Sequence, residues 1–238
     1  MTKVSRTPGP FYLAIIPARA GSKRVSNKNI RLFGGIPLIA HTIRAASNSK
    51  KIGRTVVSTD SEGIAKIARE WGGDVPFLRP PEIAGDTSPA IETIVHAVQV
   101  LEQGGQKVNA VVLLQPTSPL RTATHIDAAL ELFESSNVDT VTAVCRVREH
   151  PYYVWMVDEK GMRPFFSLHE MTLGRHELPK AVIENGSIFV VRRPVLDRGT
   201  MYGERVVPYF MDARSSLDID THEDMLLGEI YLREIGQQ

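Results

Sequence analysis

The stretch Val108-Asn-Ala-Val-Val-Leu-Leu114 is the most strand-like part of this sequence. Its near-continuous apolar run is typical of a parallel strand that is buried on both faces of a sheet. Shorter apolar runs occur at 12–16, 55–58, 138–144 and 187–191, and segments with helical periodicity lie between most of them. Strands that alternate with helices predict an α/β fold, in which helices flank a mostly parallel sheet.

The chain length of 238 residues fits one large domain. The alternation breaks at about 150–185, where aromatic residues, prolines and charges replace the helical pattern. Within it, apolar runs at 152–157 and 162–166 flank a short polar turn and predict a hairpin. We therefore expect a single domain over residues 11–238 with one inserted segment, preceded by a flexible tail at 1–10 that contains two prolines.

The composition excludes several classes of protein. Hydrophobic residues make up 42% and charged residues 23%, which is typical of a globular chain and not of a disordered one. No apolar run approaches the roughly 18 residues of a membrane-spanning helix, and the net charge of +1 argues against binding to nucleic acid or an anionic membrane. The single cysteine, Cys145, excludes an internal disulfide, and we expect a cytoplasmic protein.

The loop after the first strand, Pro17–Arg31, has the strongest functional pattern. It carries five cationic side chains and no acidic one between its first and last cations: Arg19, Lys23, Arg24, Lys28 and Arg31. The small residues Gly21 and Ser22 would let backbone amides approach an anion. Open α/β sheets bind ligands at the carboxyl ends of their strands, so the loop predicts a polyphosphate site. It matches neither the Walker A nor the dinucleotide fingerprint, and a solvated basic loop is the alternative.

Two further segments are expected at the same edge of the sheet. Residues 113–121 offer Gln115, Thr117 and Ser118, either to a ligand or as caps for the next helix. Asp218 and Asp220 lie two apart, so an extended backbone would point both carboxylates to one side, where they could hold Mg²⁺. Asp220 or Thr221 could instead cap the last helix. A basic loop beside an acidic pair favours phosphoryl or nucleotidyl transfer with Mg²⁺.

Helix caps give smaller expectations. Asp60 reads as the N-cap of the helix that follows the second strand. Ser88-Pro89 reads as an N-cap and a first-turn proline for the next helix. Thr221 with Asp224 resembles a capping box at the start of the last helix.

From Ile15 to the last helix, the chain resembles the acylneuraminate cytidylyltransferases, also called CMP-sialic acid synthetases. The residues that carry the resemblance are Ala18–Lys23 with Lys28-Asn29, Val57–Asp60, Arg79-Pro80 with Asp86-Thr87, Leu114–Arg121, Asn185-Gly186 and Asp218–Asp220. The resemblance implies a Rossmann-like nucleotidyltransferase fold that uses CTP and Mg²⁺. The anomeric hydroxyl of a sialic-acid-type sugar would attack the α-phosphorus and release pyrophosphate, without a covalent enzyme intermediate.

The resemblance also implies roles by matched position. Catalytic roles fall on Arg19, Lys28 and Gln115. The nucleotide would contact Arg19, Ser22, Lys23, Lys28, Asn29, Arg79 and Ser88. The sugar acid would contact Gln115, Thr117, Ser118, Arg175 and Asn185, with Arg175 on its carboxylate, while Asp218 and Asp220 would bind Mg²⁺.

Two further implications concern assembly and substrate. Members of the family typically dimerise through the inserted segment, so a homodimer is expected. The segment 200–203 differs from the aromatic sugar-pocket pattern of sialic-acid-specific members. Legionaminic acid or another keto sugar acid, including one of the keto-deoxyoctonate type, is therefore the alternative substrate. A more remote alternative is an inactive nucleotide-binding homologue.

Overall fold

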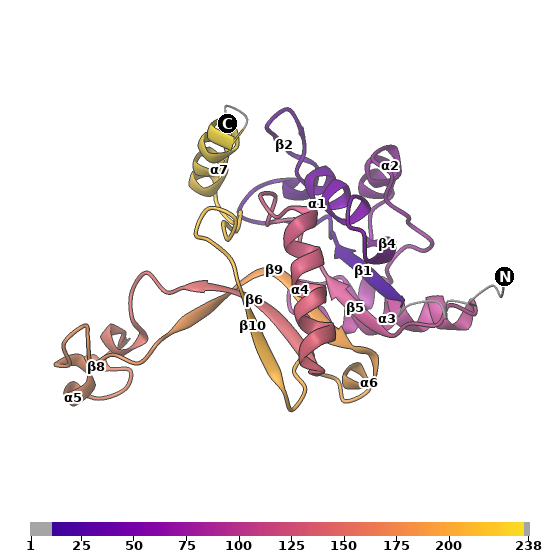
Figure 1. Ribbon diagram of the computed structural model, residues 1–238. Helices are drawn as coiled ribbons and strands as arrows, with labels where there is room; N and C mark the ends of the chain where they lie inside the picture. Colours follow the sequence, from indigo (N-terminus) through magenta and orange to yellow (C-terminus); the bar gives the residue numbers. More distant parts are fainter. Residues whose placement is uncertain (1–10, 236–238) are drawn as a thin grey trace.

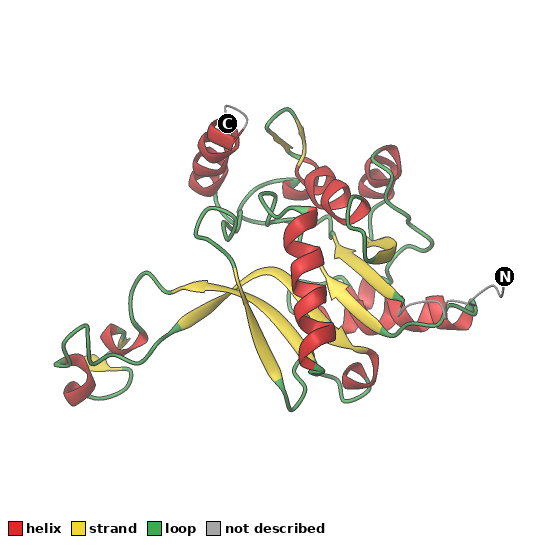
Figure 2. Cartoon of the chain, viewed as in Figure 1, coloured by secondary structure: helices red, strands yellow, loops and turns green. Residues whose placement is uncertain are grey.

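The computed structural model describes residues 11–235, which form a six-stranded sheet flanked by helices (Figures 1 and 2). The predicted flexible tail lies outside the described residues. In spatial order the strands are β10 (Val206–Phe210), β6 (Thr140–Arg146), β9 (Val182–Arg192), β5 (Ala110–Leu113), β1 (Tyr12–Pro17) and β4 (Ile52–Ser58). All pairings are parallel except those of β9 with β5 and β6. The mostly parallel α/β class is confirmed.

Side chains of β1 alternate between two hydrophobic cores, as the strand period of two requires. Tyr12, Ala14 and Ile16 pack into the core beneath α1 (Leu38–Ser47), α2 (Glu62–Glu70) and α4 (Ala123–Ser136). Leu13 and Ile15 pack on the opposite face with α3 (Ala90–Gln103) and α6 (Arg193–Leu196). Because helices cover both faces, β5 and all of β1 except Pro17 are buried, which explains their continuous apolar sequences.

Strand β9 runs against its neighbours and carries a bulge. The β6–β9 register pairs Thr142 with Phe189 but Val144 with Glu184, so residues 185–188 all lie opposite Ala143. Gly186 within the bulge has φ of +69°, a left-handed conformation that a side chain disfavours. The bulge therefore brings irregular backbone to the edge of the sheet where the cavity described below opens.

The chain leaves the sheet between β6 and β9 to form a projecting segment, residues 147–181, which we call the arm (Figure 1). The predicted hairpin is confirmed, with β7 (Trp155–Asp158) antiparallel to β8 (Gly161–Pro164). The short helices η3 (Pro151–Tyr153) and α5 (Leu168–Met171) complete the arm. Several apolar side chains of the arm are exposed in the single chain, among them Trp155, Phe165 and Phe166.

A third hydrophobic cluster fixes α7 (His222–Ile235) to the core. Met225 of α7 packs with Leu217 and Ile219, which precede the helix, and with Phe33 of the small ribbon β2 (Leu32–Phe33) and β3 (Ile36–Pro37). Val25 of the basic loop belongs to the same cluster. Apolar packing therefore holds the basic loop beside the segment that contains Asp218 and Asp220.

The caps of three helices test the local predictions. The capping box of α7 is confirmed, since the Asp224 amide donates to Thr221 Oγ1 at 3.2 Å and the Thr221 amide donates to Asp224 Oδ2 at 2.8 Å. The Asp60 cap is wrong, because Ser61 caps α2 and accepts from the Ile64 amide. The Ser88-Pro89 prediction is also wrong: Pro89 itself occupies the N-cap position of α3, which has no side-chain cap.

Between residues 11 and 235, no helix combines the length and the apolar character needed to cross a membrane.

Candidate active site

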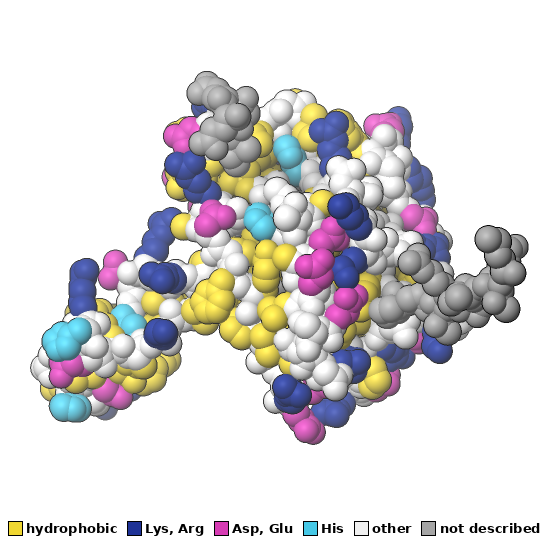
Figure 3. All heavy atoms as spheres, in the orientation of Figure 1, with side chains coloured by type: hydrophobic (Ala, Val, Ile, Leu, Met, Phe, Trp, Pro, Cys, Tyr) yellow, Lys and Arg dark blue, Asp and Glu magenta, His cyan; other side chains and the backbone are white. Residues whose placement is uncertain are grey.

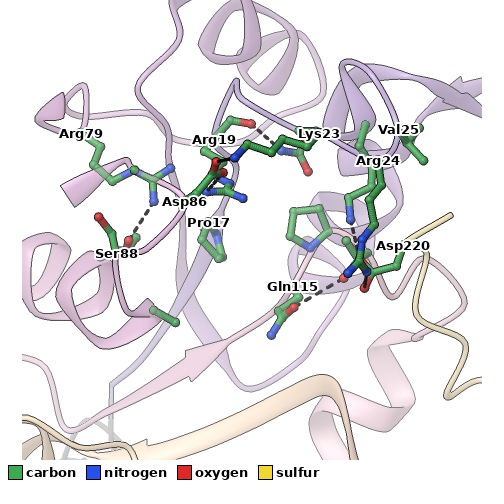
Figure 4. A pocket seen from close by; sticks show the side chains of 18 of the residues that line it. Pro17, Arg19, Lys23, Arg24, Val25, Arg79, Asp86, Ser88, Gln115 and Asp220 are labelled. Atoms are coloured by element: carbon green, nitrogen blue, oxygen red, sulfur yellow. Dashed lines mark hydrogen bonds and ion pairs between the residues drawn. The ribbon is translucent and has the colours of Figure 1, made fainter. Parts of the chain in front are cut away.

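A cavity of about 620 Å³ opens at the carboxyl ends of β1 and β5 (Figure 4). Figure 4 shows Arg79, Asp86 and Ser88 on one side of it and Arg24 and Asp220 on the opposite side. The predicted site residues that line it are Arg19, Ser22, Lys23, Lys28, Asn29, Arg79, Ser88, Gln115, Thr117 and Asp220. The structure thus brings together residues that are as much as 201 positions apart (from Arg19 to Asp220).

The basic loop is held in place by backbone contacts. Asn29 donates its side-chain amide to the Arg19 carbonyl at 2.9 Å, and Ala20 donates its backbone amide to Asp60 Oδ1 at 3.0 Å. Asn27 adopts a left-handed conformation, with φ of 53°, just before Lys28. These contacts fix the backbone of the loop while most of its cationic side chains face the cavity, as a polyphosphate site requires. They also give Asp60 a role other than the helix cap that we predicted.

Arg79 is a buried cation at the rim of this cavity, with only 6% of its surface exposed. Its Nη1 donates to Thr93 Oγ1 at 2.8 Å, and its Nη2 lies 3.8 Å from Asp60 Oδ1. Burial lowers the pKa of the guanidinium. Its Nε and Nη2 are buried and have no hydrogen-bond acceptor among the described residues. Donors buried without acceptors are costly, so this guanidinium is suited to a ligand that supplies oxygens or ring nitrogens.

Lys28 connects the basic loop to the acidic segment. Its ammonium donates to the Ile219 carbonyl at 2.9 Å and to Asp220 Oδ1 at 2.8 Å. Arg24 approaches the other oxygen of Asp220 at 3.4 Å. Asp218 is exposed two residues away; the surrounding protein partly desolvates its carboxyl and, with the nearby charge of Asp220, raises its pKa.

Asp86 is a site residue to which the sequence analysis assigned no role. Its carboxylate pairs with Arg19 Nη1 at 2.7 Å and also contacts the Lys23 ammonium. The hydrogen bond from Lys23 holds the pKa of Asp86 below its usual value, so the carboxylate remains charged at neutral pH. An anionic side chain therefore occupies the position where the basic loop was expected to bind a phosphate.

Four predicted site residues lie outside the lining of this cavity. Ser118 is fully buried and Asn185 is nearly so, with Asn185 Nδ2 donating to Ser216 Oγ at 2.8 Å. Asp218 stands beside the cavity next to Asp220. Arg175 is exposed on the arm, and no residue of the arm lines the cavity of its own chain.

Comparison with known proteins assigns the family. A family model described as Cytidylyltransferase matches residues 13–161, which include the basic loop, Arg79, Asp86 and Gln115. The chain belongs to this family. This cytidylyltransferase is 38% identical over 231 residues to the CMP-N,N'-diacetyllegionaminic acid synthase of Legionella pneumophila, covering 95% of this chain and 97% of that one.

A second relative is matched over a smaller share of its own length. The N-acylneuraminate cytidylyltransferase of Escherichia coli is 36% identical over 90% of this chain, but the match spans only 50% of that protein. Among solved structures, a CMP:2-keto-3-deoxy-manno-octonic acid synthetase complexed with CTP has the same fold. It matches with a TM-score of 0.72 at 16% identity and covers 94% of this chain and 99% of that chain.

Replacing Asp86 tests whether its carboxylate competes with the nucleotide. Asp86→Asn should tighten the binding of CTP several-fold, because the triphosphate would no longer have to displace an anion from Arg19 and Lys23. Isothermal titration of CTP measures the dissociation constant. Asp74→Asn is the matched control, since Asp74 pairs with Arg54 away from the cavity. Weaker binding by Asp86→Asn would show instead that this carboxylate supports the nucleotide.

Proposed function

We propose that this cytidylyltransferase transfers CMP from CTP to a sialic-acid-type, nine-carbon 2-keto sugar acid, with Mg²⁺ as the metal. The main support is the cavity itself, which places the cations of the basic loop beside the Asp220 carboxylate and the Gln115 amide. Such a site suits a triphosphate next to a polar acceptor. The full-length relative named for diacetyllegionaminic acid and the relatives named for N-acylneuraminate support the class of sugar.

In this proposal the enzyme aligns two substrates and stabilises charge. Arg19, Lys23 and Lys28 would bind the triphosphate, and Ser22 and Asn29 would complete the loop around it. The anomeric hydroxyl of the sugar acid forms a bond to the α-phosphorus and loses its proton to solvent, while the bond to the pyrophosphate oxygen breaks, so negative charge grows on the leaving group. Cations fixed in position before the reaction stabilise that charge without reorganising.

The rest of the cavity would hold the sugar acid on one side and the nucleoside on the other. Gln115 and Thr117, which follow β5, present an amide and a hydroxyl to the cavity. We assign them to the acceptor sugar, near its reacting hydroxyl. Arg79 and Ser88 lie across the cavity and are assigned to the nucleotide (Figure 4).

The acidic segment fits Mg²⁺. The metal is usually held by one or two carboxylates together with substrate phosphates, and not by a cage of protein ligands. The described residues contain no group of three or more acidic or imidazole ligands, but Asp220 lines the cavity next to the cations and Asp218 is nearby. Desolvation and, to a smaller extent, the charge of Asp220 raise the pKa of Asp218, and a bound cation would favour its charged form. When bound, Mg²⁺ would neutralise charge on the phosphates.

The position of Arg175 on the arm, away from the cavity of its own chain, supports its supply to a sugar carboxylate by a second copy of the chain. The arm projects from its own core, and its residues contribute nothing to the cavity of the same chain. Exposed apolar side chains continue from the arm to β9 and β10, where Ile183 and Phe210 are 56% and 61% exposed. Figure 3 shows hydrophobic side chains on the arm and on the core beside it. We propose a cytoplasmic homodimer in which this surface is buried and each arm serves the partner's site.

The identity of the sugar is tested by pyrophosphate release from CTP with a panel of keto sugar acids, using UTP as the control nucleotide. N-acetylneuraminate is the first candidate acceptor. Diacetyllegionaminate is the second, because one match that spans nearly the whole of both chains is to a protein named as the synthase of its CMP derivative. Comparable turnover with N-acetylneuraminate and the best substrate supports the first assignment, and a strong preference for legionaminate selects the second. No turnover with any keto sugar, while CTP still binds, would refute the proposed function.

Asp220→Asn tests the metal assignment. Loss of the carboxylate should lower turnover by about 100-fold and raise the Mg²⁺ concentration needed for half-maximal rate, because the remaining Asp218 would bind the metal weakly. Steady-state rates over a Mg²⁺ titration give both quantities. Asp197→Asn is a matched control, since Asp197 forms an ion pair with Arg193 outside the cavity. Near-normal activity at limiting Mg²⁺ would contradict a metal role for Asp220.

Arg175→Ala tests the carboxylate contact. We expect the KM for the sugar acid to rise about ten-fold or more, with little change in the KM for CTP, because a charge-assisted hydrogen bond to the sugar alone would be lost. Arg163→Ala, on β8 of the same arm, is the control. Equal effects on both substrates would contradict the assignment.

Mixed dimers test whether the arginine comes from the partner. In a heterodimer of one Arg175→Ala subunit and one Asp220→Asn subunit, one site regains both residues if the arm serves the other subunit. Assayed at a sugar-acid concentration well below the KM, co-purified and differently tagged heterodimers should therefore recover close to half of the normal activity per dimer. Heterodimers no more active under these conditions than the average of the two parent variants would contradict the exchange of arms.

A further inference from the structure

Arg121 is a buried cation that the proposed mechanism does not use. It ends the segment Gln115–Arg121 and is only 2% exposed. Among the described residues no carboxylate pairs with it, and burial lowers its pKa to about 9. The guanidinium thus remains charged at neutral pH. A charge buried without an ionic partner is costly unless well-placed hydrogen bonds compensate for the loss of water.

The guanidinium holds three parts of the fold together. Its Nη1 donates to the Gln115 carbonyl at 3.2 Å and to the Ser187 carbonyl at 2.7 Å, while its Nη2 donates to Thr42 Oγ1 of α1 at 2.6 Å. The Thr42 hydroxyl in turn donates to the Gln115 carbonyl at 3.4 Å. These contacts fix the peptide of Gln115 relative to both α1 and β9.

The Ser187 carbonyl is available because it lies in the β9 bulge, outside the regular strand pairing. The same bulge meets the side chain of Gln115: a Cβ placed on Gly186 would lie 3.5 Å from Gln115 Nε2. The Gln115 amide therefore packs against the Gly186 backbone on one side and faces the cavity on the other. Arg121 donates hydrogen bonds both to the Gln115 carbonyl and to the Ser187 carbonyl of the bulge.

A connected set of hydrogen bonds extends this support to the acidic segment. Asn185 Oδ1 accepts from the Ser187 amide at 3.0 Å, and its Nδ2 donates to Ser216. The Ile219 amide donates to the Thr117 carbonyl at 2.8 Å. A shift of the bulge or of the loop after β5 would therefore displace both Gln115 and the residues next to Asp220.

We propose that Arg121 is a positioning residue for the acceptor sugar: its fork of donors fixes the Gln115 peptide and the β9 bulge so that the Gln115 amide faces the reacting hydroxyl. The inference rests on the proposed sugar-binding role of Gln115. A planar guanidinium reaches three acceptors in fixed directions, whereas the single ammonium of lysine cannot keep that geometry. Lysine at this position would preserve the charge but not the placement.

Arg121→Lys is the test, with N-acetylneuraminate, or the better acceptor if the panel identifies one, as the varied substrate. We expect kcat/KM for the sugar acid to fall by about 100-fold, as small misplacements of a substrate-orienting group do, while the dissociation constant of CTP stays within about two-fold of the parent value. Thermal unfolding is measured in parallel. Arg192→Lys is the matched control, because Arg192 also donates to a backbone carbonyl, that of Val138, but lies outside the cavity.

The result that overturns the inference is a parallel loss of CTP binding, sugar use and melting temperature, which a purely structural role predicts. If Arg121→Lys does not fold, Thr42→Val takes its place, since it removes one acceptor of the guanidinium and keeps the side-chain shape. It should raise the KM for the sugar acid selectively, and an unchanged sugar constant would overturn the inference.

A double-mutant cycle separates this inference from the proposed role of Gln115. If Gln115→Ala alone leaves the sugar constant unchanged, the proposed role of Gln115 fails, and with it the premise of this inference. If Gln115→Ala raises the constant, Arg121→Lys should add little in the Gln115→Ala background, because both changes disrupt the same contact. Fully additive losses would overturn the positioning role of Arg121 while leaving that of Gln115 intact.

Discussion

The contact between Lys28 and the residues before α7 determines the architecture of the site. The Lys28 ammonium binds the Ile219 carbonyl and the Asp220 carboxylate, so the loop after the first strand meets the segment before the last helix. The apolar packing of Val25, Leu217 and Ile219 holds the same two segments together. Without this junction, the basic and acidic halves of the cavity would have no fixed distance between them.

The electrostatics of the cavity follow from the same arrangement. Several cations of one loop face a shared space, and their mutual repulsion is relieved by Asp86 at one end and by Asp220 at the other. Both carboxylates are on residues exposed enough to be displaced or shared when an anionic substrate enters. In the proposed reaction the triphosphate replaces Asp86 as the partner of Arg19 and Lys23. Asp220 would then be shared between Lys28 and the metal.

The reversed strand β9 supports Gln115 from outside the lining of the cavity. Because it runs against β5 and β6, its bulge falls beside the carboxyl end of β5, where Gln115 follows. Gly186 and the buried Arg121 together determine how the bulge meets this loop. The same strand leads directly from the arm into the core, so β9 links the arm, and a partner bound to it, to the proposed acceptor site.

Much of this structure follows from local sequence signals. Strands β1 and β5 are recognisable because burial on both faces demands uninterrupted apolar residues, and the loops after them must then share one edge of the sheet. The edge strand β10 was not predicted, since its alternating exposure and its proline, Pro208, give a weak signal. Strand order and the reversal of β9 depend on long-range pairing that no local pattern records.

The candidate site was predictable for related reasons, with informative exceptions. Glycine, lysine and acidic clusters at strand ends identified most of the lining residues, including Lys28 and Asp220. Asp86 and Arg121 received no role, because a lone charged residue in a loop looks solvated until the fold shows what it pairs with or how deeply it is buried. Asp60 was misread as a cap for the same reason: its partner, the Ala20 amide, is 40 residues distant.

The most direct test of this account is a crystal structure with a non-hydrolysable CTP analogue and Mn²⁺ in place of Mg²⁺. The anomalous Mn²⁺ peak should lie at Asp220 and the phosphates, with Arg19 and Lys23 on the triphosphate and Asp86 released from both. A metal bound away from Asp218 and Asp220, or a triphosphate that makes no contact with the basic loop, would contradict it.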